Sequence, residues 1–312
     1  FGGFPISGVA GARIVQTDQN LKGNSKILGV VKPVDIDTSR TDVLPSLAMK
    51  AKLTSNLIAR VVTGKAIERA AFGDYNPSLQ LFSGVNNLEG NGFAGNPYLK
   101  PTESTNVDIA LEWYFAPTGS LTATVFEHKF TNRLASQVKK ETYGGMVYNV
   151  NRQYNLSKAN LEGFELSYRQ FYDKLPGWMS GFGLESNFTY MKGEQTGPDG
   201  VSGAFLGQSK TSYNVVGLYE KEAWSARLAY NWRSKFLAET PYRGTKNSLY
   251  VAPMKTLDAS LSYKISKNTT VTLDGNNLLN QAYNDYFNEN PALIRDIRRY
   301  DRAIGLALHW KM

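Results

Sequence analysis

The residues best placed to do chemistry in this sequence are carboxylates that share one face of a strand. Asp108 and Glu112 lie four residues apart in a segment that alternates apolar and polar side chains, so both project to the same side. Glu165 and Glu185 stand in two consecutive segments of this kind and could be cross-strand neighbours. Paired carboxylates can catalyse glycoside hydrolysis. Charged side chains also gather on the polar side of a closed sheet, where they hydrogen-bond one another. We favour this second interpretation and expect no enzymatic activity.

Cysteine is absent and only two histidines occur, His128 and His309. Disulfides, thiolate metal sites and cysteine nucleophiles are therefore excluded, and a His-based triad is poorly supported. Both histidines fall at polar positions of alternating segments, where we expect hydrogen bonding rather than metal ligation. The Asn-, Asp- and Gly-rich residues 84–96 and 197–203 lack the ligand spacing of an EF-hand. We expect no catalytic residue, no metal and no cofactor.

Aromatic and charged residues in the long irregular segments are the candidates for ligand binding. Aromatic faces stack on sugar or catecholate rings, and Arg or Asp side chains bind hydroxyl or acidic groups through directional hydrogen bonds. An alternative is that the tyrosines only pack the irregular segments against one another. The predicted ligand-binding residues are Tyr75, Phe93, Tyr98, Tyr148, Tyr242, Arg243, Tyr283, Tyr286 and Arg295, with Tyr143, Tyr154 and Asp285 beside them.

These side chains need a scaffold, and residues 160–191 show its unit. Phe164, Leu166 and Tyr168 occupy one face of the first arm of this segment, with polar residues between them. Pro176-Gly177 supplies turn chemistry, and the alternation then resumes. The segment is therefore a long antiparallel hairpin, each arm of about ten residues, which is the length that crosses a bilayer when tilted.

The same alternation recurs along the chain and predicts about twelve strands. Their connections alternate between short and long, as in outer-membrane barrels, which have short periplasmic turns and long extracellular loops. We expect residues 19–41, 66–102, 131–158, 192–209, 235–253 and 279–299 to be the long connections. Within the first of them, an apolar patch at residues 27–31 could extend the strands beyond a membrane. The predicted strands are residues 6–18, 44–53, 57–65, 106–115, 120–130, the two arms within 160–191, 213–219, 224–233, 257–263, 270–278 and 303–312.

Composition agrees with a membrane sheet. The chain has 312 residues and a mean hydropathy of −0.35, and no run approaches the eighteen or so apolar residues of a membrane helix. This argues against a helical membrane protein but not against strands with apolar residues at every second position. The formal charge of +8 could indicate nucleic acid, anionic lipid or an anionic ligand. Because the basic residues are scattered, apart from residues 295–302, we expect no nucleic-acid binding.

Tryptophans give an independent indication. Trp113, Trp178, Trp224 and Trp310 lie beside predicted short turns or the C-terminus, whereas Trp232 lies near a long connection. Indoles favour the membrane interface, where the ring and its N–H are both satisfied. Tyr190, Tyr213 and Tyr230 would supply the opposite aromatic girdle. A soluble β-protein does not explain this placement, so we predict an all-β, transmembrane antiparallel β-barrel.

Several long segments resemble the C-terminal barrel half of TonB-dependent receptors, and more specifically the receptor group associated with carbohydrate uptake. They are GNPYLKPTESTNVDIALEWYF (residues 95–115), GVAGARIVQTDQ (8–19), residues 42–79, residues 160–191, SARLAYNWR (225–233) and TLDGNNLLNQAY (272–283). The resemblance implies a signal peptide, a TonB-contact segment, a plug and a barrel of about twenty-two strands. Residues 1–312 would then be the last twelve strands, with the plug and first strands outside this sequence.

The resemblance also implies a function. We expect an outer-membrane receptor that takes up a scarce nutrient actively, with energy from the TonB–ExbB–ExbD complex acting through the absent N-terminal region. Carbohydrate or oligosaccharide is the first expected cargo and a ferric siderophore the second; a passive porin is the alternative of another class. Outer-membrane lipid and lipopolysaccharide are expected partners, and the C-terminus is expected to be periplasmic. One departure is the ending Trp310-Lys311-Met312, where the family usually ends on an aromatic residue.

Overall fold

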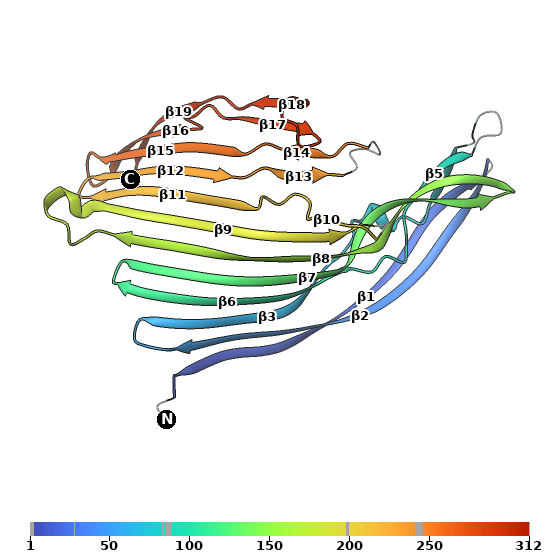
Figure 1. Ribbon diagram of the computed structural model, residues 1–312, viewed down its shortest axis with the longest axis horizontal. Coiled ribbons are helices and arrows are strands. Elements are labelled where there is room, and N and C mark those ends of the chain that lie inside the picture. Colours follow the sequence, from blue (N-terminus) through green and yellow to red (C-terminus); the bar gives the residue numbers. More distant parts are fainter. Residues whose placement is uncertain are drawn as a thin grey trace.

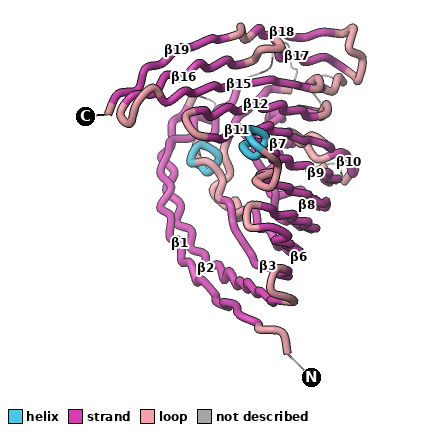
Figure 2. The backbone as a smooth tube through the Cα atoms, turned by 90° about the vertical axis from the view of Figure 1, so that its left-hand side faces the viewer, coloured by secondary structure: helices cyan, strands magenta, loops and turns pink. Residues whose placement is uncertain are grey.

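The computed structural model describes residues 3–27, 29–82, 84, 89–197, 200–240 and 246–311. This part of the chain forms nineteen strands and two short 3-10 helices, with fifteen strands in one sheet and four in another. Figure 1 shows the larger sheet as one curved wall of long strands, and Figure 2 shows its curvature from the end. No helix among the described residues is long and apolar enough to cross a membrane.

Twelve long strands build the wall, and each is antiparallel to the next along the chain, which confirms the predicted strands and their order. They are β1 (Ile6–Ile27), β2 (Val30–Lys52), β3 (Leu57–Glu68), β6 (Thr102–Ala116), β7 (Gly119–Tyr143), β8 (Met146–Phe171), β9 (Phe182–Thr196), β11 (Thr211–Lys221), β12 (Trp224–Arg233), β15 (Met254–Lys264), β16 (Thr269–Asn276) and β19 (Ala303–Trp310).

The other elements lie in the connections between wall strands. The smaller sheet has the order β13-β14-β17-β18, and β10 adds to the edge of β9. These short elements are η1 (Phe72–Tyr75), β4 (Leu79–Phe82), β5 (Gly90–Ala94), η2 (Gly177–Gly181), β10 (Ser202–Ala204), β13 (Phe236–Glu239), β14 (Leu249–Val251), β17 (Ala282–Phe287) and β18 (Ile294–Arg299).

The wall has two different ends. The β2–β3, β6–β7, β8–β9, β11–β12 and β15–β16 connections lie together at what we call the short-turn end, at the left of Figure 1. Both termini lie there too: the Lys52 N–H donates to the Pro5 carbonyl at 3.0 Å, and the Lys311 N–H to the Asn268 carbonyl at 2.9 Å. The opposite end, which we call the loop end, carries the remaining connections.

The wall also has two different faces. Strand register places Ala59, Leu111, Ala123, Leu166 and Phe188 in one row across five strands, which we call the apolar face. The polar face carries cross-strand ion pairs. Arg60 Nε donates to Glu112 Oε1 at 2.8 Å, His128 Nε2 lies 3.2 Å from Asp108 Oδ1, and Arg169 Nε lies 3.0 Å from Glu185 Oε1.

These partners explain the carboxylates without catalysis. Asp108 and Glu112 share the polar face, as predicted, but each contacts a basic side chain of the neighbouring strand. The expected juxtaposition of Glu165 and Glu185 is wrong. Glu165 stands opposite Thr189 and Glu185 opposite Arg169. A cation directly across the ladder neutralises the carboxylate, whereas two carboxylates there would repel each other.

Aromatic side chains mark both edges of the apolar face. At the short-turn end Trp224 packs on Tyr263 with ring centroids 4.5 Å apart. Toward the loop end Tyr213 lies between Tyr230 and Trp232, at 6.1 and 5.2 Å. The tryptophan and tyrosine positions therefore agree with the two predicted girdles.

Two of the predicted long connections are paired strands. Residues 19–41 continue as the paired arms of β1 and β2, which confirms the strand extension expected there, and residues 131–158 continue as the arms of β7 and β8, where an irregular segment was expected. The β7–β8 turn is tight: Gly144 and Gly145 have φ of 58° and 83°, which a type I′ turn requires. These arms carry many polar side chains on both faces, so the alternation of apolar and polar residues is interrupted along their sequence. Asn20 Nδ2, for example, bonds Asp35 and Asp37 at 2.7 and 2.8 Å on the face that holds Ile14 further down the strand.

Candidate ligand-binding site

A short hairpin at the loop end joins two distant wall strands. β4 and β5, which we call the strap, come from the connection between β3 and β6. β4 pairs in parallel with β1 at Lys26, and β5 pairs in parallel with residues 148–151 of β8. Leu79, Tyr148 and Val150 form a small buried core beneath the strap. The strap therefore connects β1 and β8 at the loop end of the wall.

Glycine permits two close approaches in this region. A Cβ on Gly90 would lie 2.4 Å from Cδ1 of Tyr148, and one on Gly95 would lie 2.5 Å from the Asn76 carbonyl oxygen. Both distances are far below van der Waals contact. Gly90 allows β5 to lie directly on the Tyr148 ring. Gly95 allows the chain after β5 to pass close to the backbone of Asn76, which follows η1.

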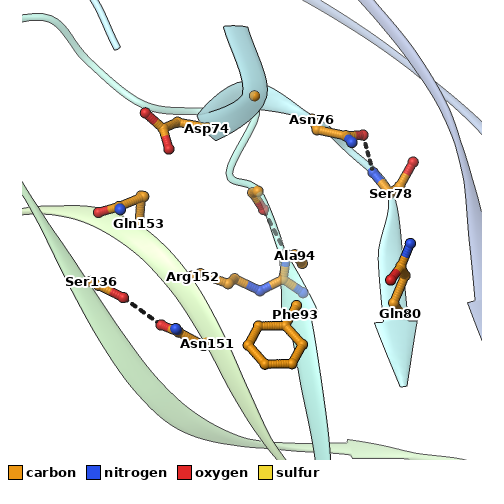
Figure 3. A pocket seen from close by; sticks show the side chains of 12 residues that line it. Asp74, Asn76, Ser78, Gln80, Phe93, Ala94, Ser136, Asn151, Arg152 and Gln153 are labelled. Carbon is orange, nitrogen blue, oxygen red and sulfur yellow. Dashed lines mark hydrogen bonds between the residues drawn. The ribbon is translucent and has the colours of Figure 1, made fainter. Parts of the chain in front are cut away.

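A cavity of about 310 Å³ opens between the strap and the tips of β7 and β8. Figure 3 shows polar groups on both sides of it, with the Phe93 ring at its edge. Its size is near the lower end of known ligand pockets. The lining side chains are Asp74, Asn76, Ser78, Gln80, Phe93, Ala94, Ser136, Asn151, Arg152 and Gln153.

Arg152 is the structural centre of this cavity. Its Nε and Nη2 donate to both oxygens of Glu141 at 2.8 and 2.9 Å, and its Nη1 donates to the Gly95 carbonyl at 2.9 Å. The guanidinium thus ties the β7–β8 hairpin to the chain that leaves the strap. Because its charge is neutralised by Glu141, the cavity presents mainly amide, hydroxyl and one further carboxylate group to a ligand.

The Arg152–Glu141 pair makes the cavity sensitive to acid. The hydrogen bonds from Arg152 hold the pKa of Glu141 below its ordinary value, although partial burial opposes them. A carboxyl group whose pKa is lower in the folded than in the unfolded state stabilises the folded state. This stabilisation is fully present above the unfolded-state pKa, about 4.3 for Glu, and is lost as the pH falls through the folded-state pKa. We expect ligand affinity to stay constant from pH 8 to 5 and to fall below about pH 4, measured by titration at each pH.

The control for this acid effect is Glu141→Gln, whose amide does not titrate. Its affinity should be lower than that of the unmodified protein at neutral pH, and the acid-dependent fall should disappear. An unchanged acid profile in Glu141→Gln would show that another group carries it.

The arrangement suits recognition of a neutral, many-hydroxyl molecule. Amide and hydroxyl groups can each donate to and accept from ligand hydroxyls, and the Phe93 ring, with 57% of its surface exposed, offers an apolar face for stacking. No group of three or more metal-ligating side chains occurs among the described residues.

The predicted ligand-binding residues fall into two groups, and the first surrounds the strap. Phe93 lines the cavity and Tyr98 is 69% exposed beside a second cavity. Tyr75 is buried in η1, and Tyr148 is 1% exposed beneath the strap. The Tyr148 ring packs under β5, and Tyr75 lines the second cavity while being mostly covered. Ligand contact through these two rings stays a prediction.

The second group lies in the smaller sheet. Arg295 Nε and Nη2 donate to both oxygens of Asp285 at 2.8 and 2.5 Å. Tyr286 is buried and stacks on Tyr250, with centroids 6.2 Å apart, and the Arg298 guanidinium lies over the Tyr283 ring at 5.3 Å. Tyr242 and Arg243 lie outside the described residues.

The amides of the cavity were missed from the sequence. Asn149, Asn151, Gln153 and Asn155 recur at every second position, and this spacing was the available signal for a strand with a polar face. Asn76 and Gln80 carried no such signal, because only the pairing of the strap with β1 and β8 brings them to the same cavity.

Comparison with known proteins identifies the family. A family model described as "TonB dependent receptor-like, beta-barrel" matches residues 1–278. Comparison with curated proteins finds no match. Solved structures with the same fold include the ferric-catecholate import receptor Fiu from E. coli K12 (TM-score 0.67, 15% identity, 98% of this chain and 42% of that one).

Two further structures are similar: the ferric yersiniabactin uptake receptor FyuA from Yersinia pestis (TM-score 0.65, 15% identity, 98% of this chain and 43% of that one) and the copper transporter OprC (TM-score 0.65, 15% identity, 98% and 45%). At these identities the likeness establishes the fold alone. The chain spans less than half the length of each of these proteins.

Proposed function

Because this chain belongs to the TonB-dependent receptor-like β-barrel family, we propose that it forms the C-terminal part of the barrel of an outer-membrane receptor for active nutrient uptake. The single observation that carries this proposal is the division of the wall. The apolar face, bordered by aromatic residues, suits lipid, and the polar face with its ion pairs suits a lumen that holds a plug. A barrel wall has no energy source of its own, so uptake draws on TonB–ExbB–ExbD through a plug outside residues 1–312.

The two different ends of the wall support an orientation for the proposed receptor. Barrels of this class keep short turns at the periplasmic end and long connections outside. The short-turn end, with the C-terminus, is accordingly periplasmic, and the strap and the smaller sheet are extracellular. The apolar face contacts outer-membrane lipid, and the arms of β1 and β2 extend into the lipopolysaccharide layer.

The proposed cargo is a carbohydrate or oligosaccharide. The cavity under the strap supports it through its neutral amides and hydroxyls and the exposed Phe93 ring. A ferric siderophore is the second candidate, favoured by the similar structures of a ferric-catecholate receptor and a ferric yersiniabactin receptor. Catecholate complexes are anionic, whereas Arg152, which lines this cavity, is neutralised by Glu141. We therefore place carbohydrate first.

Uptake by the complete receptor in its own host tests the proposal. We expect oligosaccharide uptake to require both the gene that contains this chain and a functional TonB. Uptake that persists without TonB would indicate a passive barrel instead. Uptake of a ferric siderophore, but of no oligosaccharide, would show that the cargo is the second candidate, a ferric siderophore.

Phe93→Ala in the complete receptor tests the site itself. Removal of a stacking ring is expected to weaken oligosaccharide binding by roughly tenfold, equivalent to about 1.4 kcal/mol, measured by calorimetric titration. The matched control is Phe72→Ala, because Phe72 is 90% exposed in η1 and does not line the cavity. An equal loss of oligosaccharide affinity in the two variants would show that Phe93 does not contact the ligand.

A further inference from the structure

A second cavity lies between the wall and the segment that follows the strap. It measures about 390 Å³. One side is formed by β1 and β2, which contribute Thr17, Gln19, Asp37, Thr38, Ser39, Arg40 and Asp42; the other side is Arg69, Tyr75 and residues 97–101. Residues 74–76, at the end of η1, alternate between the two cavities. Asp74 and Asn76 line the first cavity, and Tyr75 lines the second. The second cavity is therefore a separate space built on the same connection.

Asp42 gives this cavity an unused hydrogen-bond acceptor. Its side chain is 4% exposed, and Oδ1 accepts from Arg40 Nε at 2.5 Å. Oδ2 is buried and has no partner among the described residues. Arg40 is shared with a second carboxylate, since its Nη2 donates to Glu103 Oε1 at 2.7 Å. A buried carboxylate oxygen without a donor is rare in folded proteins, which indicates that a donor from outside the described chain belongs there.

Among the described residues, two cations of the cavity lack a close carboxylate, although the carboxylate of Asp37, which accepts from Asn20 Nδ2 at 2.8 Å, also lines it. Arg40 is balanced by Asp42 and Glu103. Arg69 Nη2 donates to the Thr17 hydroxyl at 2.7 Å, but within the described ranges neither Arg69 nor Lys100 has a carboxylate within 4.0 Å. Two cations that line one cavity without carboxylate partners favour an anionic group between them.

An exposed aromatic ring, that of Tyr98, lies beside these charged groups in the second cavity. The side chain of Tyr98 lines the cavity and is 69% exposed, although its neighbours Pro97 and Leu99 are buried. The buried neighbours and a hydrogen bond from the Tyr98 N–H to Asn96 Oδ1 at 3.1 Å fix the backbone on both sides of this ring. Tyr98 is therefore a positioned stacking surface rather than part of a loose loop.

We propose that this second cavity binds an acidic sugar unit, which stacks on Tyr98, places its carboxylate between Arg69 and Lys100, and donates a hydroxyl to Asp42 Oδ2. The proposal rests on the proposed carbohydrate uptake and adds a substrate class to it: oligosaccharides that carry uronate groups. A single buried water would satisfy Asp42 but would leave both cations unused. An acidic side chain of the plug would satisfy the cations but leave no donor for Asp42.

The test uses the complete receptor and two probes of the same length, an oligogalacturonate and its methyl ester, with a neutral gluco-oligosaccharide as reference. We expect the acid to bind about tenfold more tightly than the ester, as a charge-assisted contact requires, and to lose this preference at high salt. Arg69→Gln with Lys100→Gln should lower the affinity for the acid to that for the ester and so abolish the preference. Lys158→Gln, at an exposed lysine outside the cavity, is the matched charge control.

Asp42→Asn gives a second readout. The amide offers a donor where the hydroxyl needs an acceptor, so binding of acid and ester should weaken together while the preference between them remains. Migration of unheated samples in detergent gels checks that each variant is folded.

Each outcome decides the proposal. Equal affinities for acid and ester, or a preference that survives Arg69→Gln with Lys100→Gln, would overturn it. If the neutral reference binds in a Phe93-dependent manner and the acid gains nothing, this inference fails and the proposed function stands. If no carbohydrate binds to the unmodified receptor, both fail. A preference that appears only after deletion of the plug would assign the cavity to a plug carboxylate.

Discussion

Asp285→Ala is expected to open the β17–β18 hairpin. Asp285 is fully buried and accepts two hydrogen bonds from Arg295, whose side chain is 25% exposed. Removal of one partner from a buried ion pair costs about 3–5 kcal/mol. Since Arg295 can partly reach solvent and its Nη2 also lies 3.8 Å from Asp296 Oδ2, we expect the lower end, about 3 kcal/mol. This corresponds to amide exchange roughly a hundredfold faster in residues 282–299.

Hydrogen exchange in the complete receptor measures this change, and Asp296→Ala is its control. Asp296 is one third exposed and pairs with Arg298 at 2.7 Å, so its loss should cost under about 1 kcal/mol. If exchange in Asp285→Ala matched that of the unmodified protein, the buried pair would not hold the smaller sheet together.

Gly163→Val is expected to prevent correct pairing of β8 with β9. A Cβ at Gly163 would lie 2.2 Å from the Tyr190 carbonyl oxygen and 2.9 Å from Cα of Met191, and both are backbone atoms of the partner strand. The ring of Phe126 would also lie 2.8 Å from this Cβ, so a side chain at position 163 would contact it as well. Overpacking costs about 1–3 kcal/mol where side chains can move, and here the backbone itself must move, so we expect at least the upper value.

The yield of heat-modifiable, folded barrel after detergent refolding measures the effect of Gly163→Val. Gly217→Val is the control, because nothing lies within 4 Å of a Cβ at Gly217 and valine favours strands. We expect normal yield from Gly217→Val and little folded barrel from Gly163→Val. Similar yields would mean that the two strands tolerate a wider separation than the structure shows.

The wall could be predicted from sequence because one of its faces is apolar. In β6 the residues Val107, Ile109, Leu111 and Trp113 alternate with polar ones, and this pattern alone fixes both the strand and its face. The tip of β7 gave no such pattern, since polar residues occupy both of its faces, and the alternation in the tip of β8 is interrupted by Arg152. The Gly144-Gly145 pair was the local signal of a hairpin turn, but it stood within a segment that otherwise appeared irregular.

The candidate site was less predictable than the wall. Phe93 and Tyr148 are aromatic residues of predicted loops, yet one is 57% exposed and the other 1%. Their difference arises because β5 pairs with β8 and lays Gly90 on the Tyr148 ring. Parallel pairing between segments so distant in sequence has no local signature, so burial, and with it the identity of the contact residues, could not be read from composition or spacing.

The strap has a consequence for the order of folding. Many neighbouring wall strands are joined by turns of a few residues and can pair at little loop-closure cost, whereas β3 and β6 are separated by the segment that holds the strap. The strap can pair only after β1 and β8 both stand in the wall, because its partners are Lys26 on one side and residues 148–151 on the other. Contacts of long sequence separation form slowly, so we expect the strap to pair late in assembly. The two cavities that it borders would then form only after the wall strands beside them have paired.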